Sequence, residues 1–247
     1  MKMSGNTILI TGGGSGIGRA LAHRLHDMGN HVIVAGRKLG ALEQTIAGRE
    51  RMAAITLDVE DSAAIKAFAA QVKAEHPGLN ILINNAGIMR PENLTAARDL
   101  SDAEATVVTN LLGPIRLTDA FIDHLAAQED AVIVNVSSAL AFVPLPATPT
   151  YSATKAAIHF YTLALRQQLK GKVEVIELVP PGVQTELQPG QSKQEGFLPL
   201  DAFIDEVLGL LQRQPTPAEI CVERAGFLRN AEAEGRFDKT LEMLSAL

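Results

Sequence analysis

The segment TYSATKAAI, residues 150–158, places a tyrosine and a lysine four positions apart behind a cluster of prolines. Residues four apart lie on one face of an α-helix, so Tyr151 and Lys155 would point into the same space. A free phenol has a pKa of about 10, and a neighbouring ammonium favours the phenolate and lowers that pKa. A tyrosine tuned in this way can donate a proton to a carbonyl oxygen or take one from an alcohol. The alternative is that two amphipathic side chains share a helix face without a chemical role.

A glycine-rich turn, TGGGSGIG at residues 11–18, follows the first apolar run and opens the first helical segment. Glycines allow a tight turn and let the backbone approach a pyrophosphate, which then lies at the helix N-terminus. A nucleoside-triphosphate loop is disfavoured, because no Lys-Ser or Lys-Thr pair follows the glycines. The turn therefore predicts a dinucleotide site. Its expected members are Gly12, Ser15, Gly16, Ile17 and Gly18.

The second apolar run ends in VIVAGRK, residues 32–38, where the ribose of a dinucleotide is expected. Sites selective for NAD carry an Asp or Glu about 20 residues beyond the glycines, which bonds the ribose 2′-hydroxyl. This region instead holds Gly36, Arg37 and Lys38, so no carboxylate would repel a 2′-phosphate and Arg37 could bond it. The pattern favours NADP(H) over NAD(H). The alternative is a solvated basic turn.

Short apolar runs alternate with amphipathic segments along the chain. Several runs are apolar on consecutive positions, as in parallel strands covered on both faces. The predicted strands are residues 7–11, 31–35, 53–57, 80–84, 131–137 and 173–179. Helices are expected over residues 16–28, ending before Gly29, and over residues 62–74. The repeated order predicts an α/β fold of Rossmann type, a doubly wound and mainly parallel sheet with helices on both faces. Such sheets bind ligands beyond the carboxyl ends of their strands.

Length and composition limit the class of protein. The 247 residues, 47% of them hydrophobic and 20% charged, predict a single globular domain over residues 1–247. A formal net charge of −6 argues against nucleic acid as a partner. The single cysteine, Cys221, can form no intramolecular disulfide, and the histidine spacing suggests no metal site. The absence of a signal-like or membrane-length apolar segment predicts a cytoplasmic protein without a membrane partner.

Four motifs in this order resemble the short-chain dehydrogenase/reductase family, in its compact single-domain branch. They are TGGGSGIG, NNAG at residues 84–87, Ser138 followed by Tyr151-Ser-Ala-Thr-Lys155, and PPGVQT at residues 180–185. The resemblance covers about residues 5–186. It implies an NADP(H)-dependent oxidoreductase that interconverts a carbonyl and an alcohol by hydride transfer, with Tyr151 as the general acid/base.

The resemblance also implies the roles of the neighbouring polar residues. Ser138 would hydrogen-bond the substrate oxygen; Ser137 could compete, but the usual spacing of 13 residues before the tyrosine selects Ser138. Lys155 would also bind the nicotinamide ribose. Asn110, in the apolar segment VVTNLLGP, would hold a water that relays protons through Lys155.

Further cofactor contacts follow from the same resemblance. They are Asp58 and Val59 at the adenine, Asn85, Ala86 and Gly87 beneath the adenosine ribose, and Val183 and Thr185 at the nicotinamide amide. The loop that follows, residues 186–200, would fold over the substrate as a lid.

Apolar residues around these motifs suggest a pocket wall for a lipophilic or aromatic carbonyl. They are Leu140, Phe142, Val143, Pro144, Leu145, Leu187, Phe197 and Leu198.

The helix that begins near Tyr151 is apolar on a second side, which includes Phe160 and Leu163. In the family that side packs against another subunit, which implies a homodimer or homotetramer.

The chain departs from the family at its end, where the glycine-rich DGG sequence usual after the last strand is absent.

Two other functions stay open. The first is a non-catalytic protein that senses NADP(H), since fold alone does not imply catalysis. The second is an epimerase or dehydratase that uses the same tyrosine. The complete set of Asn110, Ser138, Tyr151 and Lys155 argues against the first, and the compact length argues against the second.

Overall fold

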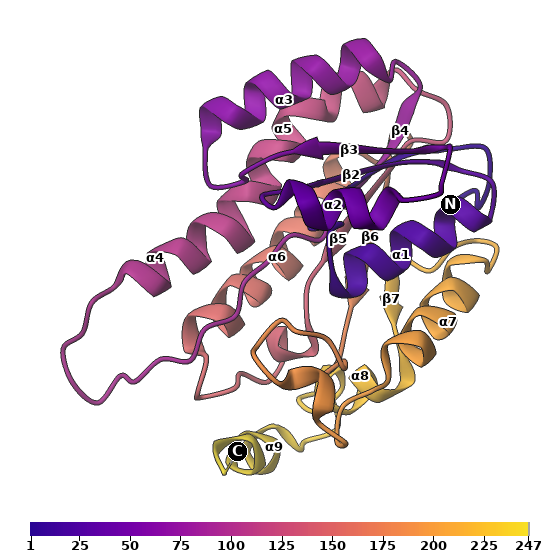
Figure 1. Ribbon diagram of the computed structural model, residues 1–247. Helices are drawn as coiled ribbons and strands as arrows, with labels where there is room; N and C mark the ends of the chain where they lie inside the picture. Colours follow the sequence, from indigo (N-terminus) through magenta and orange to yellow (C-terminus); the bar gives the residue numbers. More distant parts are fainter. Residues whose placement is uncertain (247) are drawn as a thin grey trace.

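The computed structural model describes residues 1–246 and confirms the predicted fold class. Within these residues, seven strands form one parallel sheet in the order β3-β2-β1-β4-β5-β6-β7 (Figure 1). The strands are β1 (Thr7–Thr11), β2 (His31–Gly36), β3 (Met52–Thr56), β4 (Leu79–Asn84), β5 (Val132–Val136), β6 (Glu174–Val179) and β7 (Glu219–Cys221).

Helices cover both faces of this sheet. In the described part of the chain the helices are α1 (Gly16–Asp27), α2 (Leu39–Ile46), α3 (Ser62–Glu75), α4 (Ser101–Val107), α5 (Gly113–Ala126), α6 (Pro149–Gln168), α7 (Leu200–Leu211), α8 (Glu223–Arg229) and α9 (Phe237–Ser245), of which α4 and α9 lie away from the sheet (Figure 1). A π-helical turn, η1 (Val108–Leu112), joins α4 to α5, and the 3₁₀ turns are η2 (Ala139–Ala141) and η3 (Gln191–Lys193).

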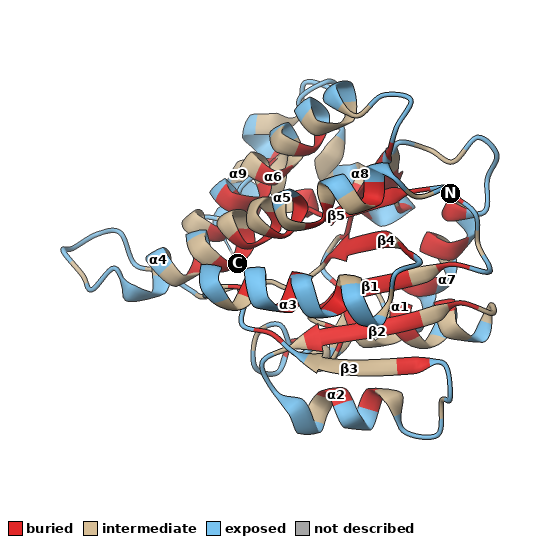
Figure 2. Ribbon diagram, turned by 90° about the horizontal axis from the view of Figure 1, so that it is seen from above, coloured by how far each residue is buried: buried red, intermediate tan, exposed pale blue. Residues whose placement is uncertain are grey.

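Strand β1 shows why the sheet carries helices on both sides. Successive side chains in a strand point to opposite faces. Ile8 and Ile10 enter a core shared with α1 and α7, whereas Leu9 enters a core shared with α3 and α5. All three side chains are fully buried, and Figure 2 shows the buried residues concentrated in the strands and on the inner sides of the helices. Two-sided burial explains the uninterrupted apolar runs of the sequence.

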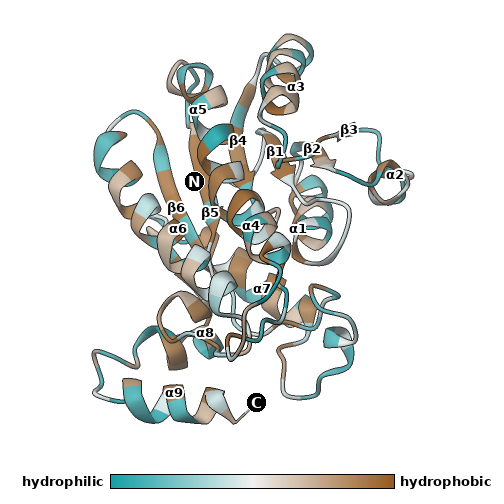
Figure 3. Ribbon diagram, turned by 90° about the vertical axis from the view of Figure 1, so that its left-hand side faces the viewer, coloured by the Kyte–Doolittle hydropathy of each residue, from teal (hydrophilic) through white to brown (hydrophobic). Residues whose placement is uncertain are grey.

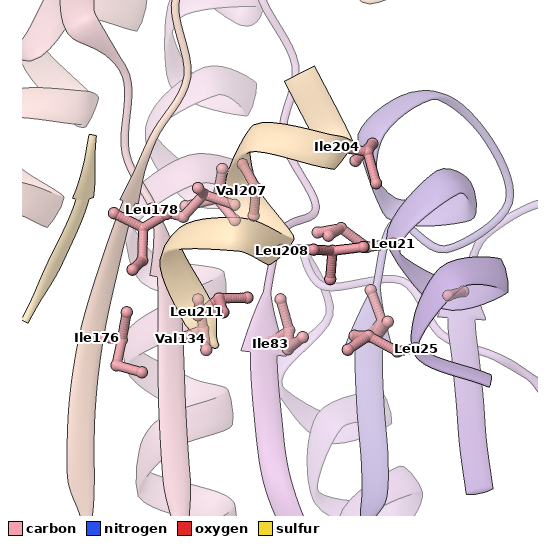
Figure 4. Packing of buried hydrophobic residues seen from close by; sticks show 14 of the residues in the cluster. Leu21, Leu25, Ile83, Val134, Ile176, Leu178, Ile204, Val207, Leu208 and Leu211 are labelled. Carbon is pink, nitrogen blue, oxygen red and sulfur yellow. The ribbon is translucent and has the colours of Figure 1, made fainter. Parts of the chain in front are cut away.

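The core beneath α1 and α7 anchors one face of the sheet. Leu25 of α1 and Leu208 of α7 lie over Ile83 of β4 and Val134 of β5 (Figure 4). Burial of one such leucine contributes about 1.5–3 kcal/mol. This packing joins α1, near the N-terminus, and α7, which follows β6, to the same face of the sheet.

The strand order reverses between β1 and β4. The chain passes outward through β1, β2 and β3, and then returns to place β4 on the other side of β1. Crevices open at the carboxyl ends of strands at such a switch point. Asn85, directly after β4, donates from Nδ2 to the carbonyl oxygen of Thr11 at 2.9 Å. The glycine turn and the NNAG segment therefore meet at this point.

The six predicted strands and two predicted helices appear as β1–β6, α1 and α3, with ends that differ by one residue. The chain beyond residue 199 was not assigned from the sequence, and it adds α7, the three-residue β7, α8 and α9. Helix α9 is amphipathic (Figure 3), and its Leu241 and Leu244 pack with Val143. No helix within residues 1–246 has an apolar stretch of bilayer length.

Candidate active site

Two adjoining cavities of about 320 and 360 Å³ form one cleft at the carboxyl ends of the strands. Their shared lining is Gly12, Ser15, Ala86, Gly87 and Ile88. The first cavity also holds Ser138, Tyr151 and Lys155, and we name it the catalytic end. The second holds Arg37 and Lys38, and we name it the basic end. Each cofactor residue predicted from the sequence lines one of the two cavities.

Helix α6 carries Tyr151 and Lys155 into the catalytic end. Pro149 begins this helix, where its missing N–H costs nothing. Tyr151 and Lys155 lie one turn apart and are 7% and 4% exposed. The Nζ atom of Lys155 lies over the phenol ring, 5.5 Å from its centroid, and donates to the carbonyl oxygen of Val136 at 2.8 Å. The predicted juxtaposition on one helix face is confirmed.

Burial decides the acidity of both groups. It raises the pKa of Tyr151 to about 12, an effect that a hydrogen bond with Ser138 partly offsets. Burial also lowers the pKa of Lys155 to about 8. The Tyr151 pKa is therefore raised and not lowered as expected, because the loss of hydration is its largest cause. At neutral pH the phenol is protonated and can donate.

The two adjacent serines have different partners. Ser138 is the N-cap of the turn η2, and its Oγ accepts from the backbone N–H of Leu140 at 3.1 Å. Ser137 donates from Oγ to Oε1 of Glu177 at 2.5 Å. The Ser137 hydroxyl is bonded to the buried Glu177, whereas Ser138 lines the catalytic end together with Tyr151. The resemblance that selected Ser138 over Ser137 thus agrees with where the two hydroxyls lie, and the catalytic role of Ser138 stays a prediction.

Asn110 lies in the π-helical turn η1, a kind of turn that often occurs at functional sites. Its Oδ1 accepts from the N–H of Ile88 at 2.9 Å, and its Nδ2 donates to the carbonyl oxygen of Ile88 at 2.8 Å. Nδ2 also lies 3.3 Å from Oγ1 of Thr154 on α6. The buried Asn110 side chain therefore ties the Ile88 backbone to the catalytic helix. Its role in holding a water stays a prediction.

The glycine turn is shaped for close approach of a ligand to the backbone. Gly12 and Gly16 have φ values of +67° and +51°, which favour glycine. A Cβ atom on Gly18 would lie 2.4 Å from the carbonyl oxygen of Gly12. The turn also opens α1, so backbone N–H groups and the helix dipole face the cleft. This cradle fits the pyrophosphate of a dinucleotide.

Arg37, Lys38 and Asp58 are exposed at the basic end, which the buried Val59 also lines. Arg37 Nη1 lies 3.3 Å from Oε1 of Glu60, which also accepts from Thr109 Oγ1 at 2.8 Å. Glu60 was not predicted as part of the site. It places a carboxylate beside the arginine expected to bind a 2′-phosphate.

The loop after β6 borders the catalytic end through Glu186, Leu187 and Gln191. Gln191 donates from Nε2 to the Val183 carbonyl oxygen at 2.8 Å and to Thr185 Oγ1 at 3.2 Å. The loop is held internally by Glu186, whose carboxylate accepts from Ser192 and from the Gly190 N–H. These bonds lower the pKa of Glu186. The sequence indicated the loop but not the inward-facing Gln191.

The predicted apolar wall is largely wrong. Among the described residues that line the catalytic end, Leu187 is the one member of that group. Leu140, Val143 and Leu145 pack with the C-terminal segment around Ala231 and Leu244. These side chains form a small hydrophobic core with the C-terminal segment. This core could not be predicted because α8 and α9 were not expected from the sequence.

Comparison with known proteins identifies the family. A sequence profile described as short chain dehydrogenase matches residues 6–196. The chain belongs to the short-chain dehydrogenase family. The predicted family is thereby confirmed.

Two curated relatives of this short-chain dehydrogenase cover most of its length. An uncharacterized oxidoreductase, DltE, of Bacillus subtilis is 36% identical over 251 residues, covering 99% of this chain and 98% of that protein. A sulfoacetaldehyde reductase of Chromohalobacter salexigens is 35% identical, covering 72% of this chain and 73% of that protein.

Solved structures agree with this assignment. The crystal structure of a short chain dehydrogenase from Burkholderia cenocepacia in complex with NADP has a TM-score of 0.82, 25% identity and full coverage of both chains. Together with the family match, this makes the protein an NAD(P)-dependent oxidoreductase of the short-chain dehydrogenase family.

Proposed function

We propose that this short-chain dehydrogenase uses NADP(H) to interconvert a ketone or aldehyde and the corresponding alcohol. The observation that carries the proposal is the buried group of Ser138, Tyr151 and Lys155 at the catalytic end of a cleft that also contains the glycine cradle. The bound cofactor supplies or accepts the hydride. The chain itself must move a proton and stabilise charge on the substrate oxygen.

The geometry supports Tyr151 as the proton donor for carbonyl reduction. With a pKa of about 12, the phenol is protonated at neutral pH. Ser138, which lines the same cavity as the phenol, can donate to the same substrate oxygen and stabilise the negative charge that develops there. Lys155 is charged below its pKa of about 8 and favours the phenolate that proton transfer leaves behind.

Side chains at the basic end support NADP(H) as the preferred cofactor. Arg37 and Lys38 offer two cations where Gly36 leaves no carboxylate to select the 2′-hydroxyl of NAD. The Burkholderia cenocepacia relative was crystallised with NADP, which agrees with this preference. Val183 and Thr185 would bind the nicotinamide amide, next to the Gln191 side chain.

Two structural roles complete the proposal. Residues 186–200 would cover the substrate, since Glu186, Leu187 and Gln191 already border the catalytic end. The outer side of α6 would form a subunit contact, since Phe160 is 70% exposed and Leu163 is 37% exposed on it. A monomer in sedimentation analysis would contradict the subunit contact.

The proposed function is tested by following cofactor absorbance while the protein acts on a panel of ketones, aldehydes and diketones. NADPH and NADH are supplied separately. Oxidation of NADPH should occur with at least one carbonyl and should disappear in Tyr151→Phe. Tyr161→Phe, which changes the other tyrosine of the same helix, is the matched control and should retain turnover. Tight NADPH binding without turnover across the panel would favour the sensing function instead.

A further inference from the structure

A buried acid lies directly behind the catalytic serines. Glu177 on β6 has a fully buried side chain and takes no part in the proposed reaction. Its two carboxylate oxygens have separate partners: Ser137 Oγ donates to Oε1 at 2.5 Å, and Nδ1 of His159 lies 2.8 Å from Oε2. A buried carboxylate without such partners would cost several kcal/mol, so these contacts are required to keep it there.

His159 belongs to the catalytic helix, one turn beyond Lys155. Its ring packs edge-on against Phe142 at 4.8 Å between centroids and against Phe160 at 5.2 Å. The guanidinium of Arg229 lies 4.4 Å from the centre of the Phe142 ring. This enclosure leaves the His159 side chain 12% exposed, so its contact with Glu177 is strengthened by the low polarity of its surroundings.

The backbone between the two serines is extended, with φ −167° and ψ 154° at Ser138. Neighbouring side chains in an extended segment point to opposite sides. When Ser137 is turned toward Glu177, Ser138 is turned the other way, into the catalytic end that it lines together with Tyr151. The backbone N–H of Ser137 also donates to Leu178 at 2.9 Å, which limits rotation of this segment.

We propose that Glu177, supported by His159, is a positioning residue that anchors Ser137 and thereby directs the Ser138 hydroxyl toward Tyr151. The inference rests on the proposed function for its kinetic readout. Neither Glu177 nor His159 touches the reacting atoms; both act through Ser137.

The kinetic test uses two variants that remove the same hydrogen bond. Ser137→Ala and Glu177→Met should each lower kcat by about 10- to 100-fold, the size expected when a catalytic group is slightly misplaced. The Kd for NADPH, measured by fluorescence titration, should not change. Glu177→Gln keeps an acceptor oxygen for Ser137 and should restore most of the turnover. The double variant should lose no more than the more impaired single variant, since both changes act on one contact.

The matched control is Asn30→Ala, far from the cleft. Asn30 is also fully buried, and its side chain bonds the Asn6 N–H at 3.0 Å and the Leu25 carbonyl oxygen at 2.7 Å. Its replacement should lower the melting temperature but leave kcat unchanged. Wild-type kcat in Ser137→Ala would overturn the proposal. An equal loss of kcat in Asn30→Ala would also overturn it, because the effect would then follow stability alone.

A crystal structure of Ser137→Ala tests the same point without turnover. The Ser138 hydroxyl should turn away from the catalytic end that it lines with Tyr151. An unchanged Ser138 would overturn the inference even in an active enzyme. If the wild-type protein turned over no carbonyl, the proposed function would fail, and the position of Ser138 in this structure would still decide the inference.

Discussion

The two ends of the cleft hold their functional groups in opposite ways. At the catalytic end, Tyr151 and Lys155 are buried, and burial moves their pKa values to about 12 and about 8. At the basic end, Arg37 is exposed and lies 3.3 Å from Glu60. Charges interact strongly where water is excluded, whereas water and salt screen exposed charges. Substitutions at the catalytic end should therefore change the chemical step, and those at the basic end should change cofactor affinity by smaller factors.

Tyr151→Phe is expected to have the largest effect. Loss of the proton donor should lower kcat by about 10²- to 10⁴-fold, the usual contribution of general acid–base catalysis. The Kd for NADPH should stay the same, because the basic end and the glycine cradle are intact. Turnover is measured at saturating NADPH and binding by fluorescence titration. A variant that keeps its turnover would show that burial of this tyrosine serves packing alone.

Arg37→Ala is expected to have the next largest effect, confined to one cofactor. Bonds to a charged phosphate contribute about 1.5–3 kcal/mol, so the Kd for NADPH should rise about 10- to 150-fold. The Kd for NADH should not change, because NADH has no 2′-phosphate. Titration calorimetry with both cofactors measures the difference. Equal losses for both would remove Arg37 from the specificity argument.

The pH dependence of reduction should report Lys155. Its pKa of about 8 means that the ammonium is present below pH 8 and is lost as the pH rises further. Tyr151, with a pKa of about 12, stays protonated over the same interval. Reductive kcat should be level below pH 8 and fall by up to about tenfold per pH unit above it.

Lys155→Arg provides the control for this profile, because a guanidinium stays charged across the whole interval. The alkaline fall should be absent in this variant, whatever its absolute rate. A wild-type profile that is level to pH 10 would show that burial does not shift the Lys155 pKa in solution.

Glu60→Gln is expected to have the smallest effect. An exposed ion pair contributes about 0.2–1 kcal/mol, and Glu60 also repels a phosphate. Removal of its charge should free Arg37 and tighten NADPH binding by about 1.5- to 5-fold, with less change at high salt. The Kd is measured at two salt concentrations. Weaker binding would instead mean that Glu60 orients Arg37.

Much of the architecture could be predicted because its causes are local. Parallel strands buried on both faces require consecutive apolar residues, so β1–β6 are visible as runs. A glycine turn between a strand and a helix requires residues that tolerate positive φ, as Gly12 and Gly16 do. The four-residue spacing of Tyr151 and Lys155 needs no more than a helix to bring the two side chains together.

Contacts between distant segments could not be predicted in the same way. The short strand β7 and the helices α8 and α9 have too few residues to show a clear period, and their packing removed Val143 and Leu145 from the expected pocket wall. Glu177 lies within the apolar run VEVIELV, and an acid in a predicted buried strand is a signal that it has polar partners in the fold. Its partners Ser137 and His159 lie 40 and 18 residues away, so their identity required the folded chain.

The amino-acid sequence was sufficient for the order of the strands along the chain, the glycine cradle and the placing of Tyr151 and Lys155 on one helix face, because neighbouring residues and helical spacing specify them. The tertiary structure alone decided the acidity of Tyr151 and Lys155. Desolvation depends on every segment that excludes water from a site, so the raised pKa of Tyr151 and the lowered pKa of Lys155 arise only when the whole cleft is assembled.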